Sequence, residues 1–167
     1  MVVLKNIKVN NSKDLSSELI VLGRFKDIKM DKSISILSKE DQKNVKEALS
    51  VDLSNGAVGD FIILPGTSDF KRIMIYNLGD KSKLTNDKLR AYASKLFSLV
   101  NSKKIKEMTI DVNSFLIEPN DRAQSFLEGL VLGSYKFEDY KANKNKNNHL
   151  TDISIYGKID KSIVKKA

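Results

Sequence analysis

Apolar residues along the chain gather in short runs and in helically spaced stripes, and this pattern predicts the order of the elements. Short runs rich in β-branched side chains, bounded by polar or turn-forming residues, are typical of strands. The expected strands are residues 2–9, 18–25, 61–64, 72–76, 104–112 and 150–157. A turn containing Pro65 and Gly66 joins the third and fourth runs, which predicts a β-hairpin.

Three segments predict helices. Residues 38–49 open with Ser38, a suitable N-cap residue. Residues 84–102 have Thr85 as the expected N-cap and an apolar stripe that predicts packing on a sheet. A third helix is expected after Pro119, over residues 120–133. Strand, helix, strand and helix in succession indicate at least one right-handed crossover and a partly parallel sheet. The predicted fold class is α/β, with one domain over residues 1–167.

The segment EGLVLGSYKFEDYK, residues 128–141, joins the third helix to the residues that follow it. Gly129 and Gly133, one turn apart, remove side chains where this helix approaches a neighbour, and Gly133 also suits the left-handed residue that ends a helix. Tyr135 and Phe137 then alternate with charged residues, which predicts an extended segment with one buried side. A structural junction therefore explains most of this motif.

Composition restricts the class of protein. The 167 residues are 41% hydrophobic and 30% charged, with 2 Pro and 8 Gly, which is typical of a soluble globular domain. No apolar run approaches the roughly 18 residues of a membrane span, and the N-terminal residues lack the pattern of a secretory signal. The absence of Cys agrees with a reducing compartment. We therefore expect a cytoplasmic protein with no membrane contact.

The net charge of +8 raises the possibility of nucleic-acid binding. Only four of the 29 basic residues are Arg, the side chain best suited to bidentate phosphate contacts, so a general excess of surface Lys is the preferred explanation. One region is more concentrated, because residues 81–106 carry eight basic residues and one acid, Asp87. The candidate nucleic-acid contacts in it are Lys81, Lys83, Lys88 and Lys95.

No pattern predicts a catalytic or metal-binding residue in this chain. The one His, His149, lies in a polar segment where a solvated side chain is the expected state. The chain has neither a Gly-x-Ser-x-Gly elbow nor a phosphate-binding loop of the Gly-x4-Gly-Lys-Ser/Thr type. We expect the chain itself to bind no cofactor.

Two segments nevertheless resemble one protein family. EGLVLGSYKFEDYK is similar to the Glu-Gly, Leu-Gly, Tyr-x-Phe and Tyr-Lys signature near the end of the N-terminal domain of leucyl (cytosol, PepA-type) aminopeptidases. RIMIYNLGDKSKLTNDKLRAYASKLF resembles the same family's strand, Leu-Gly, charged loop and helix. The resemblance covers roughly residues 15–160, and Asn77 departs from the small residue expected there. The signature positions are Leu78, Gly79, Arg90, Glu128, Gly129, Gly133, Tyr135, Phe137, Tyr140 and Lys141.

The resemblance implies a noncatalytic N-terminal domain with a macro-domain-like, three-layer fold in which helices flank a mixed sheet. The parent enzyme would be a metallo-aminopeptidase with two divalent metals, Zn or Mn, in a C-terminal catalytic domain. The implied partners are that domain and the neighbouring subunits of a homohexamer. Some bacterial members also serve as DNA-binding architectural or regulatory proteins, which leaves a DNA-binding, architectural module as the alternative. ADP-ribose-type binding is a weaker alternative by fold analogy, with Gly66 and Gly79 bordering either a phosphate pocket or hairpin turns.

Overall fold

The computed structural model describes residues 6–10, 16–26, 33–51, 58–115, 120–141 and 150–157. These residues form a six-stranded mixed sheet with the order β1-β6-β5-β2-β4-β3. All neighbouring strands pair in parallel except β3 and β4, which form the predicted antiparallel hairpin. The strands are β1 Asn6–Asn10, β2 Ser17–Phe25, β3 Phe61–Pro65, β4 Phe70–Gly79, β5 Glu107–Asp111 and β6 Asp152–Tyr156.

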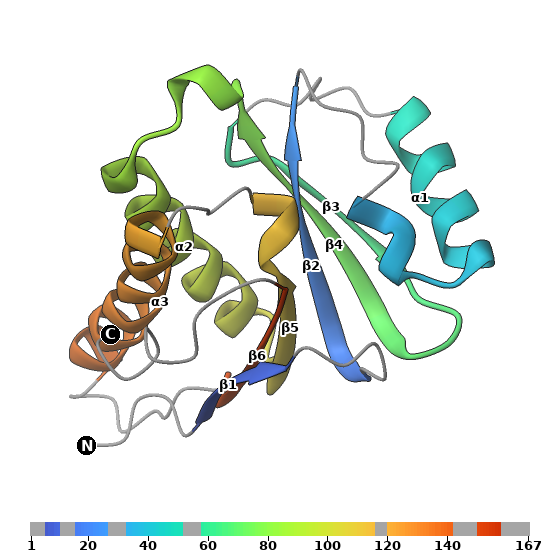
Figure 1. Ribbon diagram of the computed structural model, residues 1–167. Coiled ribbons are helices and arrows are strands. Elements are labelled where there is room, and N and C mark those ends of the chain that lie inside the picture. The colour runs from blue at the N-terminus through green and yellow to red at the C-terminus, as the bar shows by residue number, and fades with distance from the viewer. Residues whose placement is uncertain are drawn as a thin grey trace.

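Helices cover both faces of the sheet, so the fold is the predicted three-layer α/β arrangement. Helix α1, Lys39–Ser50, lies on one face, and α2, Asn86–Ser102, and α3, Asn120–Lys141, lie on the other (Figure 1). Three short 3-10 turns complete the described elements: η1 Ser33–Ile36, η2 Lys81–Lys83 and η3 Val112–Phe115.

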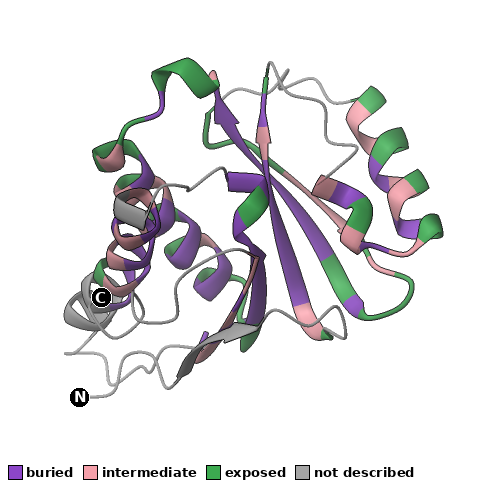
Figure 2. Ribbon diagram, in the orientation of Figure 1, coloured by how far each residue is buried: buried purple, intermediate pink, exposed green. Residues whose placement is uncertain are grey.

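The sheet separates two apolar clusters, and its central strands are buried along most of their length (Figure 2). Alternate side chains of β2 explain the separation, because Leu19 and Val21 face α2 and α3 whereas Ile20 and Leu22 face α1. The cluster under α2 and α3 contains the predicted stripe residues Leu89, Ala93, Leu96 and Val100. Tyr92 and Leu99 are half-buried at the border of this cluster.

Both predicted N-caps are confirmed. The Ser38 hydroxyl accepts a hydrogen bond from the Asp41 amide at 3.2 Å, and the Thr85 hydroxyl accepts one from the Lys88 amide at 3.2 Å. Each bond satisfies one of the amide groups that the first turn of a helix leaves without an intrahelical partner. The local sequence therefore sets where α1 and α2 begin.

The predicted end of the third helix at Gly133 is wrong. Helix α3 continues to Lys141, so Tyr135 and Phe137 belong to a helix rather than to an extended segment. Gly133 is also absent from the positive-φ glycines, which among the described residues are Gly59, Gly79 and Gly157. The reason is tertiary, since Gly133 lies where α3 passes close to α2 and a side chain does not fit.

The predicted strand boundaries also shift. Residue 104 was expected to open a strand, but Lys104 takes a φ of 62° and its amide donates to the Asn101 carbonyl, which completes the turn after α2. The strand therefore begins at Glu107. At the N-terminus, β1 begins at Asn6, and residues 2–5 of the expected first strand lie outside the described residues.

Candidate functional site

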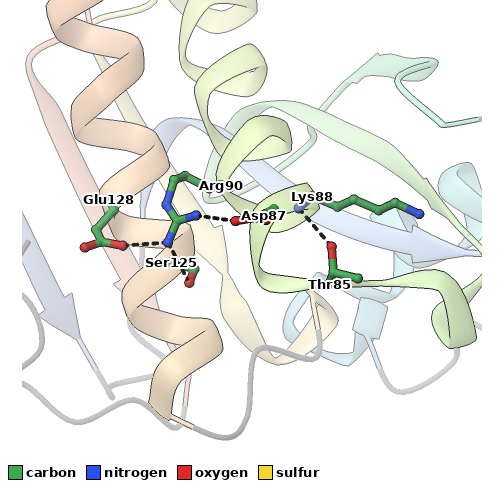
Figure 3. Close-up of polar contacts among 6 residues, drawn as sticks. All are labelled: Thr85, Asp87, Lys88, Arg90, Ser125 and Glu128. Atoms are coloured by element: carbon green, nitrogen blue, oxygen red, sulfur yellow. Dashed lines mark hydrogen bonds and ion pairs between the residues drawn. The ribbon is translucent and has the colours of Figure 1, made fainter.

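Arg90 of α2 contacts α3 through an ion pair and a hydrogen bond, and it also pairs with an acid of its own helix. Its Nη1 lies 2.8 Å from Asp87 Oδ1, and its Nη2 lies 3.1 Å from Glu128 Oε1 and 3.3 Å from Ser125 Oγ (Figure 3). The hydrogen bond to Glu128 is the largest cause that raises the pKa of Arg90 above its ordinary value. Two signature positions far apart in sequence, Arg90 and Glu128, thus meet across one helix contact.

Both glycines of the 128–141 segment lie at the same contact. A Cβ on Gly129 would lie 2.2 Å from the Arg90 carbonyl oxygen and 2.8 Å from Ala93 Cβ. A Cβ on Gly133 would lie 2.8 Å from the Ser94 carbonyl oxygen. The predicted role of both glycines in close helix packing is confirmed.

Leu78 and Gly79 end β4 at the carboxyl edge of the sheet. Leu78 is buried in the cluster under α2 and α3. Gly79 has a φ of 76°, and a Cβ there would lie 2.5 Å from Val58 Cγ2. Its carbonyl accepts a hydrogen bond from the Lys26 amide at 2.9 Å. Only glycine meets both the backbone and the packing requirement at this position. Gly66, in contrast, belongs to the turn between β3 and β4.

A hollow of about 220 Å³ lies beside Gly79, between the ends of β2 and β4 and the start of α2. The residues that line it are Lys26, Val58, Leu78, Gly79, Asp80, Lys83, Leu84, Lys88 and Tyr92. Sequence reasoning selected Lys83 and Lys88 from the charge run, but it missed Lys26, Val58 and Tyr92. Lys26 and Val58 are far from the charge run in sequence, and only the parallel pairing of β2 with β4 brings Lys26 to the hollow.

The four candidate lysines therefore divide into two groups. Lys83 and Lys88 line the hollow, and the Lys88 ammonium donates to the Lys83 carbonyl at 2.9 Å. Figure 3 shows the Lys88 side chain extending away from α3, on the opposite side of α2 from Arg90. Lys81 and Lys95 are exposed and do not line the hollow. The backbone of Tyr135, Phe137, Tyr140 and Lys141 is helical, but their side chains lie outside what the structure describes.

A second polar group, which the sequence did not indicate, lies where β5 ends. Asp111 is buried, and burial is the main cause that raises its pKa from 3.8 to about 6. Its Oδ1 accepts a hydrogen bond from the Asn113 amide at 3.1 Å. The next turn, η3, places the Ser114 hydroxyl 2.8 Å from the Gly23 amide, which donates to it. These contacts fold η3 back onto β2.

Neither a metal cluster nor a membrane span is found in the part of the chain that the structure describes. Those residues contain no group of three or more His, Cys, Asp or Glu side chains that could hold a metal ion. None of the helices described there is long and apolar enough to cross a membrane. The predicted His149 lies outside the described residues.

The comparison with protein families decides the assignment. Residues 21–144 match the N-terminal domain of the cytosol aminopeptidase family. The chain belongs to this family. A probable cytosol aminopeptidase of Sulfurihydrogenibium sp. is 25% identical over 146 residues, which are 85% of this chain and 29% of the relative. One of Clostridium perfringens is 24% identical over 155 residues, which are 87% of this chain and 29% of the relative. The chain thus spans less than a third of the length of these relatives.

Solved structures agree on the fold. A mutant of tomato leucine aminopeptidase matches with a TM-score of 0.67 at 17% identity, over 99% of this chain and 35% of that chain. A mutant macrodomain of Oceanobacillus iheyensis matches with a TM-score of 0.67 at 16% identity, over 99% of this chain and 93% of that chain. The macro-domain-like fold predicted for this family member is confirmed. At these identities the likeness concerns the fold alone.

Proposed function

We propose that this chain is a noncatalytic domain of a cytoplasmic metallo-aminopeptidase, in which it shapes access to a C-terminal catalytic domain and contributes to assembly of a homohexamer. The observation that carries the proposal is the family match over residues 21–144 together with the position of the signature residues. Four of these residues lie at the α2–α3 contact and do not surround a reaction centre. Arg90 of α2 pairs with Glu128 of α3, and Gly129 and Gly133 of α3 pack against the backbone of α2. Residues in this arrangement stabilise a scaffold.

The catalytic chemistry of the parent would come from the two divalent metals, Zn or Mn, of the C-terminal domain. The described residues of this chain supply no cluster for such ions. A leucine anilide assay with added Mn²⁺ or Zn²⁺ tests this division of labour. We expect no turnover from this chain alone, and turnover that persists through purification and scales with the chain would contradict the proposal.

The assembly role requires a separate experiment on the longer gene product. Sequencing the gene beyond the last codon of this chain should reveal the linker and the catalytic segments of the family. Light scattering on the full product and on a version without residues 1–167 then compares their masses. We expect the full product to form hexamers and the shortened one to form smaller species. Equal masses would remove the assembly role and leave the family assignment intact.

Two alternatives have less support. DNA binding rests on the basic residues alone, and only Lys83 and Lys88 of the four candidates lie together at the hollow.

ADP-ribose-type binding rests on the fold, and one neighbour, a mutant macrodomain of Oceanobacillus iheyensis, was solved with ADPR. In open α/β sheets ligands bind outside the carboxyl ends of strands where the strand order reverses. In this chain Ser114 and Phe115 of η3 pack there, directly against Gly23 of β2.

A further inference from the structure

The hollow beside Gly79 is built like a binding site and lies apart from the α2–α3 contact that holds Arg90, Glu128, Gly129 and Gly133. It lies at the carboxyl ends of the parallel strands β2 and β4, an edge where α/β folds commonly bind ligands. Its walls come from four separated parts of the chain: the end of β2, the segment before β3, the end of β4 with the η2 turn, and the first half of α2. The paired strands and the start of a capped helix hold these walls in place.

The charges around the hollow are predominantly positive. Lys26, Lys83 and Lys88 line it, and Asp80 is the one acid among its lining residues. The Asp80 carboxylate lies 3.4 Å from the Lys83 ammonium, an exposed ion pair that contributes little binding energy of its own. Three ammonium groups and one carboxylate leave a local charge of about +2. A phosphate monoester carries a charge of about −1.5 to −2 at neutral pH and matches it more closely than a carboxylate does.

The remaining lining is apolar or aromatic. Leu78 and Leu84 are buried, and Tyr92 is half-buried beside them. The volume of about 220 Å³ is below the roughly 300–1,000 Å³ typical of clefts for drug-sized ligands. The hollow thus fits a small molecule that has one strongly charged end and one flat or apolar end.

We propose that this hollow binds a small organic phosphate monoester, with the phosphate among Lys26, Lys83 and Lys88 and the organic group against Leu78, Leu84 and Tyr92. The Lys88 ammonium is held in place because it donates one hydrogen bond to the Lys83 carbonyl, and its other two donors remain for the phosphate. The N-terminus of α2, which begins after Thr85, adds a favourable potential for an anion.

Amide NMR titrations of the chain at constant low salt test the proposal, with phenyl phosphate, inorganic phosphate and benzoate as probes. We expect saturable shifts at Gly79, Asp80 and Leu84 with a phenyl phosphate dissociation constant at or below about 1 mM. Inorganic phosphate lacks the organic group and benzoate has half the charge, so each should bind about tenfold more weakly. Absence of saturable shifts for phenyl phosphate would overturn the proposal. Equal affinity for inorganic phosphate would overturn the apolar part of the site.

The variant Lys83→Gln/Lys88→Gln should weaken phenyl phosphate binding by at least tenfold. The matched control Lys95→Gln/Lys106→Gln removes the same charge from exposed positions outside the hollow and should leave binding unchanged. Thermal unfolding of both variants checks that the fold is kept. Equal weakening in the two pairs would mean that only the general positive field attracts the probe, and it would overturn the site. Tighter binding of a short DNA duplex that depends on Lys95 would overturn it in favour of an extended nucleic-acid surface.

Discussion

Helices α2 and α3 cover one face of the sheet with a large continuous apolar cluster, whereas α1 covers the other face with a smaller cluster. Close approach of α2 and α3 depends on the missing side chains of Gly129 and Gly133. The α1 layer relies instead on a buried carboxylate, since Asp41 accepts hydrogen bonds from both the amide and the hydroxyl of Thr67. One face is therefore specified by shape and the other partly by polar pairing.

The contrast between the two faces of the sheet accounts for the position of four residues of the motif that resembles the family signature. An added carbon atom at Gly129 would overlap the backbone of α2, so packing strongly favours glycine at this position. A hydrogen-bonded anchor such as Asp41 and Thr67 can be replaced by other polar pairs of similar reach. The signature residues Arg90, Glu128, Gly129 and Gly133 all belong to the face that is specified by shape.

The largest effect is expected for Gly129→Ala. In an unconstrained helix this change stabilises by about 1 kcal/mol, but here the new Cβ would meet the Arg90 carbonyl oxygen. We expect a net loss of about 2–3 kcal/mol of unfolding free energy, measured by urea denaturation. Gly133→Ala should cost less, because its nearest contact is longer.

Gly59→Ala serves as the control for the glycine substitutions. Gly59 has a φ of 87° and no atom within 4 Å of an added Cβ, so this variant reports backbone strain without steric overlap. We expect it to cost about 1–2 kcal/mol. If Gly129→Ala proved neutral or stabilising, the close helix contact would be wrong, and so would the contrast between the two faces.

The second prediction concerns the pH dependence of stability that Asp111, at the end of β5, should cause. The folded-state pKa of Asp111 is about 6, above its ordinary value of 3.8, so the folded chain binds more protons than the unfolded chain between these pH values. Its contribution to stability therefore rises as the pH falls from 7 to about 4. Asp111→Asn stays neutral and keeps an oxygen for the Asn113 amide. It should be more stable than wild type at pH 7, by on the order of 2 kcal/mol.

Urea midpoints of wild type and Asp111→Asn at several pH values measure this difference. The gap between the two proteins should close as the pH approaches 4, because both side chains are then uncharged. Parallel pH profiles would show that Asp111 does not titrate as its buried position requires.

On the α1 face, Asp41→Ala should cost about 1 kcal/mol, because it removes the buried carboxylate that accepts hydrogen bonds from the Thr67 amide and hydroxyl. Asp41→Asn retains an oxygen at the same position and should cost clearly less. Faster hydrogen exchange of the Thr67 amide in Asp41→Ala would localise the change. An alanine variant as stable as wild type would remove the polar half of the contrast.

The smallest effect is expected for the ion pair across α2 and α3. The side chains of Arg90 and Glu128 are 34% and 35% exposed, so solvent screens their attraction. A double-mutant cycle with Arg90→Gln and Glu128→Gln should give a coupling energy of about 0.5 kcal/mol that shrinks in high salt. A coupling larger than the cost of Gly129→Ala would mean that charge, rather than shape, specifies this face.

The sequence by itself determined the order of the strands and helices, the hairpin, and the starts of α1 and α2, although it ended α3 too early. These features rest on local physics, because a strand needs a short apolar run and an N-cap needs one hydroxyl beside its own helix. The helix stripe of Leu89, Ala93 and Leu96 was likewise visible, since residues of one helical face repeat at a fixed spacing.

Only the tertiary structure decided whether Gly133 ends its helix or lies in its interior against α2. Only the tertiary structure brought the residues of the hollow together. Glycine permits both a left-handed helix end and a close helix contact, and the position of Ser94 on α2 selects the second. The hollow joins Lys26 to Lys83 and Lys88 because β2 and β4 lie in parallel, a pairing between segments far apart in the chain. The burial that raises the pKa of Asp111 likewise depends on packed neighbours rather than on adjacent residues. Non-local contacts of this kind leave no periodic trace in the sequence.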